Sequence, residues 1–325
     1  MTKAIGGYPE LELRKGEHYH KEALCLNTAR NCFEYILRAK QYTKVYMPYY
    51  TCEVMFEPLK KLGISYEYYH INNILEPIDN VNLKPTEAFL YTNYYGLKQD
   101  CVKRLAKQYG NQLIVDNAQA FFAEPINGID TFYSARKFFG VADGAYLYTD
   151  TILDIQLDKD KSYERMMHLL IRADIDAESG YAYFKINDDS LINNPIRLMS
   201  NLTEKILCSI DYDKIKTIRC NNYTLLETKL KSSNKISLFM DADAVPMVYP
   251  YLVNDCSLRK LFINNKIYVP KYWSNIVEKC KKKDYEHELM EYLLPLPINH
   301  VYDIENINRI INIISNYECY NTSVD

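Results

Sequence analysis

Two runs of sequence decide the fold: Leu-Ile-Val-Asp-Asn-Ala-Gln-Ala at residues 113–120 and Phe-Tyr-Ser-Ala-Arg-Lys-Phe-Phe-Gly-Val-Ala-Asp-Gly-Ala at residues 132–145. The first begins as a short apolar strand and ends on a carboxylate, Asp116. A short apolar run of this kind is typical of a strand buried in a parallel sheet. In such sheets ligands bind beyond the carboxyl ends of the strands. The first run therefore predicts both a sheet and the edge at which a site would lie.

Strand and helix patterns alternate outward from these runs. In the first half we expect strands at 45–47, 64–71, 88–92 and 112–115, and helices from Thr28 and over 53–62 and 100–109. Strands separated by helices of this length imply right-handed βαβ units, and hence an α/β protein with a mostly parallel sheet flanked by helices.

The second half of the chain has a different pattern. We expect residues 151–235 to be helical, followed by a strand at 248–253, a helix at 256–264, a strand at 266–269 and a terminal helix at 303–315. These patterns predict a large domain over residues 1–235 and a small α+β C-terminal domain over residues 236–325.

Composition excludes several classes of protein. Of 325 residues, 48% are apolar and 25% charged, the balance of an ordinary globular protein. A net charge of -3 argues against nucleic acid or an anionic membrane as a partner. No stretch is apolar and long enough to span a bilayer, and the N-terminus lacks the pattern of a signal peptide. The nine cysteines form no Cys-x-x-Cys motif, so we expect no metal site and a cytoplasmic location.

Lys137 is the first candidate for chemistry. It lies among Phe132, Tyr133, Phe138 and Phe139, and desolvation by such rings would favour a neutral amine able to form an imine. Ser134, three residues earlier, is close enough to present a hydroxyl to a phosphate on the same cofactor. A surface lysine whose stem lies over aromatic rings would show the same pattern.

Asp116 is the second candidate. A carboxylate at the end of a buried strand needs a partner, and the ring nitrogen of pyridoxal 5'-phosphate (PLP) is one, because a protonated ring lets PLP act as an electron sink. Gln119, one turn later, could face the cofactor ring or its phenolic oxygen. An aspartate that caps the next turn is the alternative. Upstream, Thr28, Ala29 and Arg30 begin a helix, whose exposed amides and dipole suit a phosphate.

Several motifs in this order resemble the DegT–StrS family of sugar aminotransferases. They are Thr28-Ala29-Arg30, Pro48-Tyr49-Tyr50-Thr51, Asn93-Tyr94-Tyr95-Gly96, Asp116-Asn117-Ala118-Gln119, and the tract from Ser134 to Lys137 with Asp143-Gly144-Ala145 after it. The resemblance covers most of residues 20–150. Ala29 stands where the family has glycine, and Cys52 where it often has an aromatic that stacks on the cofactor. Either Tyr50 stacks on the cofactor instead, or no residue does.

The resemblance implies a fold-type I PLP-dependent transferase. Lys137 would carry PLP as a Schiff base, Asp116 would hold the ring nitrogen, and Thr28, Ala29, Arg30 and Ser134 would anchor the phosphate. The expected reaction moves an amino group from glutamate or glutamine to a nucleotide-linked keto sugar, as in nucleotide-sugar metabolism and polysaccharide biosynthesis. The family also implies a homodimer, in which residues 193–197 reach the neighbour's phosphate.

Two other functions stay open. One is a PLP lyase or dehydratase, although that branch of the family replaces the lysine with histidine and this chain keeps Lys137. The other is a PLP-fold regulator or binding protein without turnover, which Ala29 and Cys52 favour.

Overall fold

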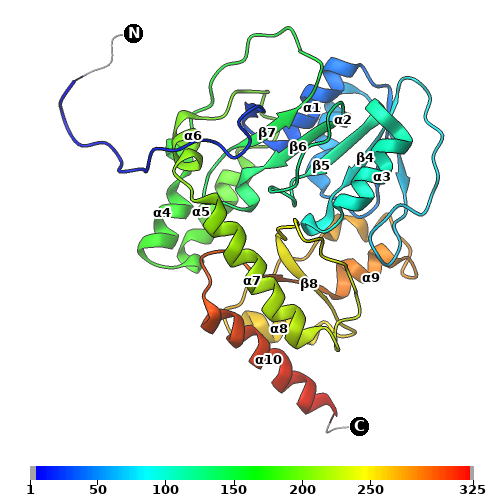
Figure 1. The fold of residues 1–325 in the computed structure, drawn as a ribbon, viewed down its shortest axis with the longest axis vertical. Helices are drawn as coiled ribbons and strands as arrows, with labels where there is room; N and C mark the ends of the chain where they lie inside the picture. The colour runs from blue at the N-terminus through cyan, green and yellow to red at the C-terminus, as the bar shows by residue number, and fades with distance from the viewer. Residues whose placement is uncertain (1–4, 323–325) are drawn as a thin grey trace.

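A seven-stranded sheet organises the first half of the chain (Figure 1), and the computed structural model describes residues 5–322. Its strands are β1 Leu24–Leu26, β2 Lys44–Pro48, β3 Ser65–Tyr69, β4 Glu87–Thr92, β5 Leu113–Asn117, β6 Asp130–Ser134 and β7 Ala145–Tyr148. They lie in the order β1-β7-β6-β5-β4-β2-β3. The five strands from β6 to β3 are parallel, and β7 is antiparallel to both of its neighbours. The prediction of a mostly parallel sheet is confirmed.

Helices cover both faces of this sheet because its strands are apolar on both faces. Leu90, Ile114 and Phe132 lie in one core cluster with residues of α1 (Ala29–Lys40) and α2 (Phe56–Leu62). Their chain neighbours Tyr91 and Val115 lie in a second cluster with residues of α3 (Gln99–Tyr109). Alternate residues of each strand therefore serve different cores, as the two-residue period of a strand requires.

The rest of the chain contains further helices and a second sheet of two strands. Helices α4 Met167–Asp174, α5 Ala177–Asp189, α6 Asn201–Cys208 and α7 Tyr212–Leu230 confirm most of the expected helical region, whereas residues 151–162 carry no helix. Next come β8 Val248–Leu252, α8 Ser257–Asn264, α9 Tyr285–Tyr292, β9 Leu293–Pro297 and α10 Ile304–Thr322. Figure 1 shows the long helix α7 running from the level of the large sheet toward β8, with α10 at the outer edge. No helix among residues 5–322 has the length and hydropathy needed to cross a membrane.

The expected strand at 266–269 is wrong. These residues carry no regular structure, and β8 pairs instead with β9, antiparallel, with Val248 opposite Pro297. The sequence concealed β9 because it contains two prolines, which lack the amide needed for a central strand; in this two-stranded sheet each strand is an edge, where proline is tolerated. The proposed domain boundary at residue 235 stays a prediction.

Gly144 joins the lysine-bearing turn to the strand that follows. Its backbone N–H donates to the carbonyl of Asn27 (2.6 Å), and its own carbonyl accepts from Ala135 N–H (3.1 Å). Its φ of +115° lies in the region that side chains disfavour, and a Cβ there would approach Thr203 Cγ2 to 2.9 Å.

We expect Gly144→Ala to lower the free energy of unfolding by about 2 kcal/mol or more, from backbone strain and the contact with Thr203 together. Urea unfolding measures the loss. Gly63→Ala is the matched control, because Gly63 also has a positive φ (+65°) but open space around its Cβ position. Equal losses in the two variants would show that the contact with Thr203 contributes nothing.

Candidate active site

The sheet register brings the candidate residues to one edge. Thr92 of β4 lies opposite Asp116 of β5, and Asp116 lies opposite Phe132 of β6. Because these strands are parallel, their carboxyl ends meet at the same edge, and Ser134 ends β6 there. The antiparallel strand β7 begins at that edge with Ala145, which lies opposite both Ser134 and Leu26. The chain therefore leads from Leu26 into Thr28 beside the end of β6.

Asp116 is buried, with only 5% of its surface exposed. Its Oδ1 accepts a hydrogen bond from Ala118 N–H (2.8 Å), so it does close the next turn, which was the alternative reading of its position. Burial raises the pKa of Asp116 to about 6; the Ala118 amide and then the charge of Lys137 act in the opposite direction. One backbone amide is little compensation for a buried carboxylate, so a cation at this position would lower the free energy of its ionised form.

Lys137 ends a short 3-10 turn, Ala135–Lys137, directly after β6. The sequence predicted that aromatic neighbours would desolvate it, and this is wrong: the residue is exposed. Phe138 explains the difference, because its ring packs into the core against Phe121 and Phe122 rather than over Lys137. The Lys137 ammonium instead lies 5.8 Å from the centroid of the Tyr272 ring.

Gln119 lies at the same edge and has one polar atom unused. Its Oε1 accepts from Tyr95 N–H (3.1 Å), which helps to hold Tyr95 at a positive φ of 58°. Its Nε2 is buried and has no hydrogen-bond partner among the described residues. A buried donor without a partner costs about 1–3 kcal/mol, so an acceptor on a bound molecule would remove that cost.

The helix start at Thr28 is built as the sequence predicted. The Thr28 side chain caps α1 by accepting from Asn31 N–H (3.2 Å), and Ala29 is the first helical residue. Arg30 is buried, and its guanidinium donates to Glu57 Oε2 (2.7 Å). The charge of Arg30 is therefore already balanced within the chain. Ser134 is also buried. The backbone of Gly144 is hydrogen-bonded both to Ala135, which follows Ser134, and to Asn27, which precedes Thr28.

Residues 193–197 lie on this helix start in their own chain. Asn27 N–H donates to the carbonyl of Arg197 (2.9 Å), and Asn31 Nδ2 donates to that of Asn194 (2.9 Å). The backbone of the segment is thus bonded beside its own candidate phosphate site rather than extended away from it. Asn193 remains exposed.

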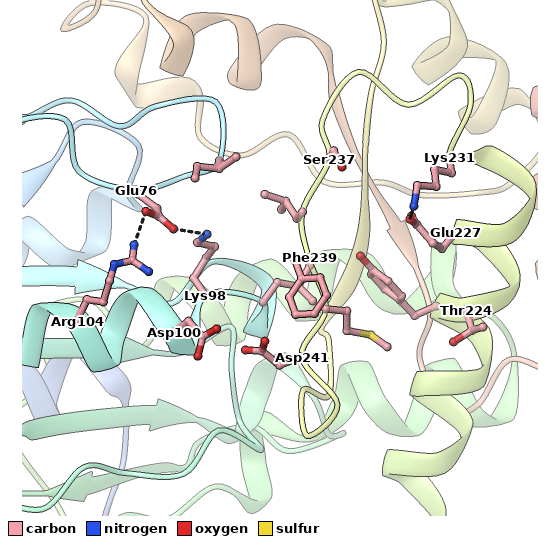
Figure 2. Close-up of a pocket in the computed structure, with 15 residues that line it drawn as sticks. Glu76, Lys98, Asp100, Arg104, Thr224, Glu227, Lys231, Ser237, Phe239 and Asp241 are labelled. Atoms are coloured by element: carbon pink, nitrogen blue, oxygen red, sulfur yellow. Dashed lines mark hydrogen bonds and ion pairs between the residues drawn. The ribbon is translucent and has the colours of Figure 1, made fainter.

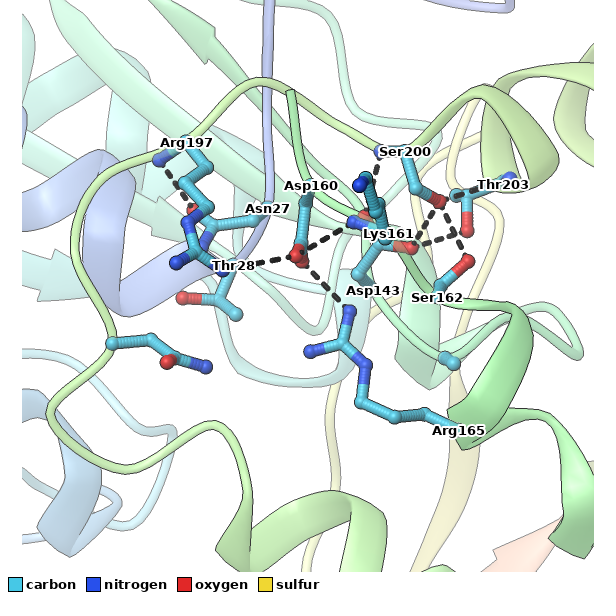
Figure 3. A network of polar contacts seen from close by, with 12 residues as sticks. Asn27, Thr28, Asp143, Asp160, Lys161, Ser162, Arg165, Arg197, Ser200 and Thr203 are labelled. Carbon is cyan, nitrogen blue, oxygen red and sulfur yellow. Dashed lines mark hydrogen bonds and ion pairs between the residues drawn. The ribbon is translucent and has the colours of Figure 1, made fainter. Parts of the chain in front are cut away.

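A polar network that the sequence did not reveal supports this segment (Figure 3). Asp143 is fully buried and accepts from the backbone N–H and hydroxyl of Ser200 (2.8 Å each) and from the Thr203 hydroxyl. Asp160 forms ion pairs with Arg165 (2.7 Å) and Arg197 (3.4 Å). The residues lie far apart in the chain, so no local spacing could have identified the set.

Tyr50, the residue predicted to stack on a cofactor, is completely buried. Its hydroxyl lies 3.3 Å from that of Tyr95, and the Trp273 ring meets it edge-on at 4.7 Å between centroids. Tyr272 and Trp273 come from the C-terminal half of the chain, and the sequence analysis missed both. The one available signal was that Trp273 is the only tryptophan.

Two cavities lie outside the group of candidate residues described above. One, of about 600 Å³, is lined by the ion pairs of Glu76 with Lys98 and Arg104 and by the exposed Phe239 (Figure 2), and it contains none of the candidate residues. The other, of about 780 Å³, is lined by Arg136, the chain neighbour of Lys137, and by Pro270, which lies two residues before Tyr272. The second cavity is therefore the one that adjoins the candidate site.

Comparison with known proteins identifies solved structures of the same fold. No protein-family model and no curated protein matches the chain. Several solved structures do match. The aminotransferase DesV of S. venezuelae has 15% sequence identity to this chain and a TM-score of 0.63, and the match covers 91% of this chain and 84% of DesV. Spr1654 of Streptococcus pneumoniae, described as a sugar aminotransferase, has 14% sequence identity and a TM-score of 0.64, and the match covers 93% of this chain and 88% of Spr1654. A DegT DnrJ EryC1 StrS aminotransferase from Brucella abortus has 12% sequence identity and a TM-score of 0.61, and the match covers 91% of this chain and 85% of that protein.

This chain has the fold of the DegT–StrS sugar aminotransferases. The predicted fold-type I architecture is confirmed. Identity is so low that the likeness extends to the fold, while the roles of individual residues rest on the geometry described above.

The raised pKa of Asp116 makes a prediction for the protein without cofactor. A carboxyl whose pKa is higher in the folded state favours folding below its unfolded pKa of 3.8, and that contribution is lost as pH rises through about 6. At about pH 8 the buried charge then costs up to ~3 kcal/mol. We expect Asp116→Asn to be more stable than the unsubstituted protein at that pH, by ~1–3 kcal/mol, and by less than half as much near pH 4.5.

Urea unfolding of the cofactor-free proteins at the two pH values measures this difference. Asp154→Asn, at an exposed aspartate, is the control and should change little. A stability difference that does not vary with pH would contradict the assigned effect of burial.

Proposed function

We propose that this protein is a PLP-dependent aminotransferase in which Lys137 holds the cofactor. The observation that carries the proposal is the buried Asp116 carboxylate, electrostatically coupled to the Lys137 ammonium at the carboxyl edge of the sheet. The same fold occurs in Spr1654 structures described as its PLP form and its PMP form, which supports the choice of cofactor.

The described residues fit PLP. Asp116 needs a cationic partner, and a protonated pyridine nitrogen is one. The unpaired Gln119 Nε2 needs an acceptor, which the phenolic oxygen would supply. Thr28, Ala29 and Ser134 surround a helix start, where amides and the helix dipole favour an anion such as the phosphate. Arg30 would act there through its helix position, because Glu57 already binds its guanidinium.

When bound, PLP withdraws electrons from the carbon that bears the amino group. Asp116, once paired with the ring nitrogen, stays ionised and keeps that nitrogen protonated. Lys137 lies at this edge, directly after β6, and its Nζ would take up and return the transferred proton. By analogy with the sugar aminotransferases of this fold, the acceptor is a nucleotide-linked keto sugar and the donor glutamate or glutamine.

The cavity of about 780 Å³ is suited to the acceptor. Its walls include the aromatic rings of Tyr181 and Phe184, with Arg136 and Arg172 close by. A reducing location such as the cytoplasm is part of this proposal, because the nine cysteines of the sequence form no Cys-x-x-Cys motif.

A PLP-binding protein without turnover is the second candidate. The ion pair of Arg30 with Glu57, which removes one cation from the phosphate site, favours it. A lyase has no specific observation in its favour. The variant described next separates the two leading candidates, because only an aminotransferase needs Lys137 for turnover.

We expect Lys137→Ala to bind PLP as the free aldehyde, with the absorbance of unlinked PLP, and to lose transamination by at least ~1000-fold. Absorbance spectra and half-reactions with a panel of amino donors measure these effects. Lys107→Ala, at an exposed lysine of α3, should behave as the unsubstituted protein. Normal absorbance and turnover in Lys137→Ala would reject Lys137 as the attachment site. PLP binding without turnover by the unsubstituted protein, over a broad panel of donors and acceptors, would favour the second candidate.

We also propose a homodimer. The α4–α5 hairpin exposes several large apolar side chains: Met167, Leu170, Ile175, Tyr181, Tyr183, Phe184 and Ile186. A concentration of this kind marks an interaction surface in ordinary globular proteins. A two-fold interface there would cover these residues in both copies at once.

Sedimentation of the PLP-loaded protein at micromolar concentration should give twice the mass of one chain. Leu170→Glu with Ile186→Glu should shift the equilibrium toward one chain mass, because each carboxylate would be buried twice in a two-fold interface. The same double change at Ile152 and Ile304, which are exposed elsewhere, is the control. A single species of one chain mass for the unsubstituted protein would refute the dimer.

A further inference from the structure

A short segment of the C-terminal half, residues 268–275, lies against the candidate site. Asn275 Nδ2 donates to the carbonyl of Thr51 (3.4 Å), which ties the segment to the loop after β2. Just before it, the Tyr272 ring lies 5.8 Å from Lys137 Nζ and is stacked with the Tyr95 ring, with centroids 6.4 Å apart and planes at 23°. Tyr272 therefore lies between the loop after β4 and the proposed attachment point of the cofactor.

Tyr50 is poorly placed for stacking on a cofactor. Its ring is inaccessible, with the Trp273 ring against it at 4.7 Å and the Tyr94 ring at 5.8 Å between centroids. Its hydroxyl is paired with that of Tyr95. A new ring could stack on Tyr50 only if one of these neighbours moved.

Tyr272 is more exposed than Tyr50. It is half-buried, and no hydrogen bond joins its hydroxyl to a residue that the structure describes. Its ring contacts the rings of Tyr95 and Trp273 and also the Lys137 ammonium, in a cation–π contact near the outer limit of about 6 Å. An imine at Lys137 Nζ would replace the exposed ammonium by a flat conjugated group at the same atom, and such groups stack on aromatic rings at about 4.5–7 Å between centroids.

We propose that Tyr272 is the aromatic wall of the cofactor site, in place of Tyr50. The inference rests on the proposed function, because it takes Lys137 as the attachment point. Tyr272 faces the ammonium when the site is empty and the planar cofactor when it is filled. The C-terminal half thus contributes directly to a site whose other groups come from the large sheet.

Trp273 makes the proposal measurable without turnover. It is the chain's only tryptophan, and its ring lies 5.2 Å from that of Tyr272. Its fluorescence therefore reports on this position alone. PLP bound beside Tyr272 would quench the emission.

The experiment is a PLP titration followed by Trp273 emission and by absorbance. It compares the unsubstituted protein with Tyr272→Phe, which keeps the ring, and Tyr272→Leu, which keeps apolar bulk without a ring. Tyr268→Leu, at a half-exposed tyrosine of the same segment, is the control. We expect Tyr272→Phe and Tyr268→Leu to stay within about twofold of the unsubstituted dissociation constant. Tyr272→Leu should weaken PLP about tenfold and shift the absorbance of the lysine-linked cofactor.

A second readout needs no cofactor. Removing the Tyr272 ring should raise the reactivity of Lys137 toward an amine-specific reagent such as trinitrobenzenesulfonate, as seen by peptide mapping, and Tyr272→Phe should not. Unchanged PLP affinity, absorbance and Lys137 reactivity in a folded Tyr272→Leu protein would overturn the inference and leave the proposed function standing. Failure of the unsubstituted protein to bind PLP would overturn both.

Discussion

Burial of the Asp116 carboxylate is the constraint on which the candidate site depends. Asp116 is the penultimate residue of a strand in which every residue is buried, and its side chain accepts a hydrogen bond from one backbone amide of the next turn. Folding tolerates this cost only if the group is neutral or meets a cation at the sheet edge. Lys137, delivered by the next parallel strand, supplies positive charge from a distance, and a cationic ring bound between the two would supply it at contact.

The remaining groups are positioned by backbone contacts around that edge. Gly144 links the turn before Lys137 to the loop before Thr28, and Asp143, next to it, binds the start of α6. On the other side, Met247 N–H donates to the carbonyl of Tyr95 (2.9 Å), so the C-terminal half is bonded to the same loop that contacts Gln119. Site and fold therefore depend on each other: the bonds that close the site also hold the two halves of the chain together.

Three cases show where local sequence patterns misjudged the contacts that the fold makes. The aromatic tract around Lys137 predicted desolvation, yet Phe138 packs into the core against Phe121 and Lys137 itself is exposed. Arg30 was assigned to a phosphate, yet it pairs with Glu57, a residue of α2 with no sequence relation to it. Residues 266–269 looked like a strand, but they carry no regular structure and β8 pairs with β9 instead.

The sequence by itself determined the alternation of strands and helices, the parallel sheet and the edge at which Asp116, Ser134 and Lys137 meet. These follow from local periodicity and from the rule that parallel strands share a carboxyl edge. Tertiary structure alone decided which ring faces Lys137, which acid neutralises Arg30 and which network surrounds Asp143. Each of these joins residues distant along the chain, and such contacts are selected by the packing of whole elements, which no local pattern of residues records.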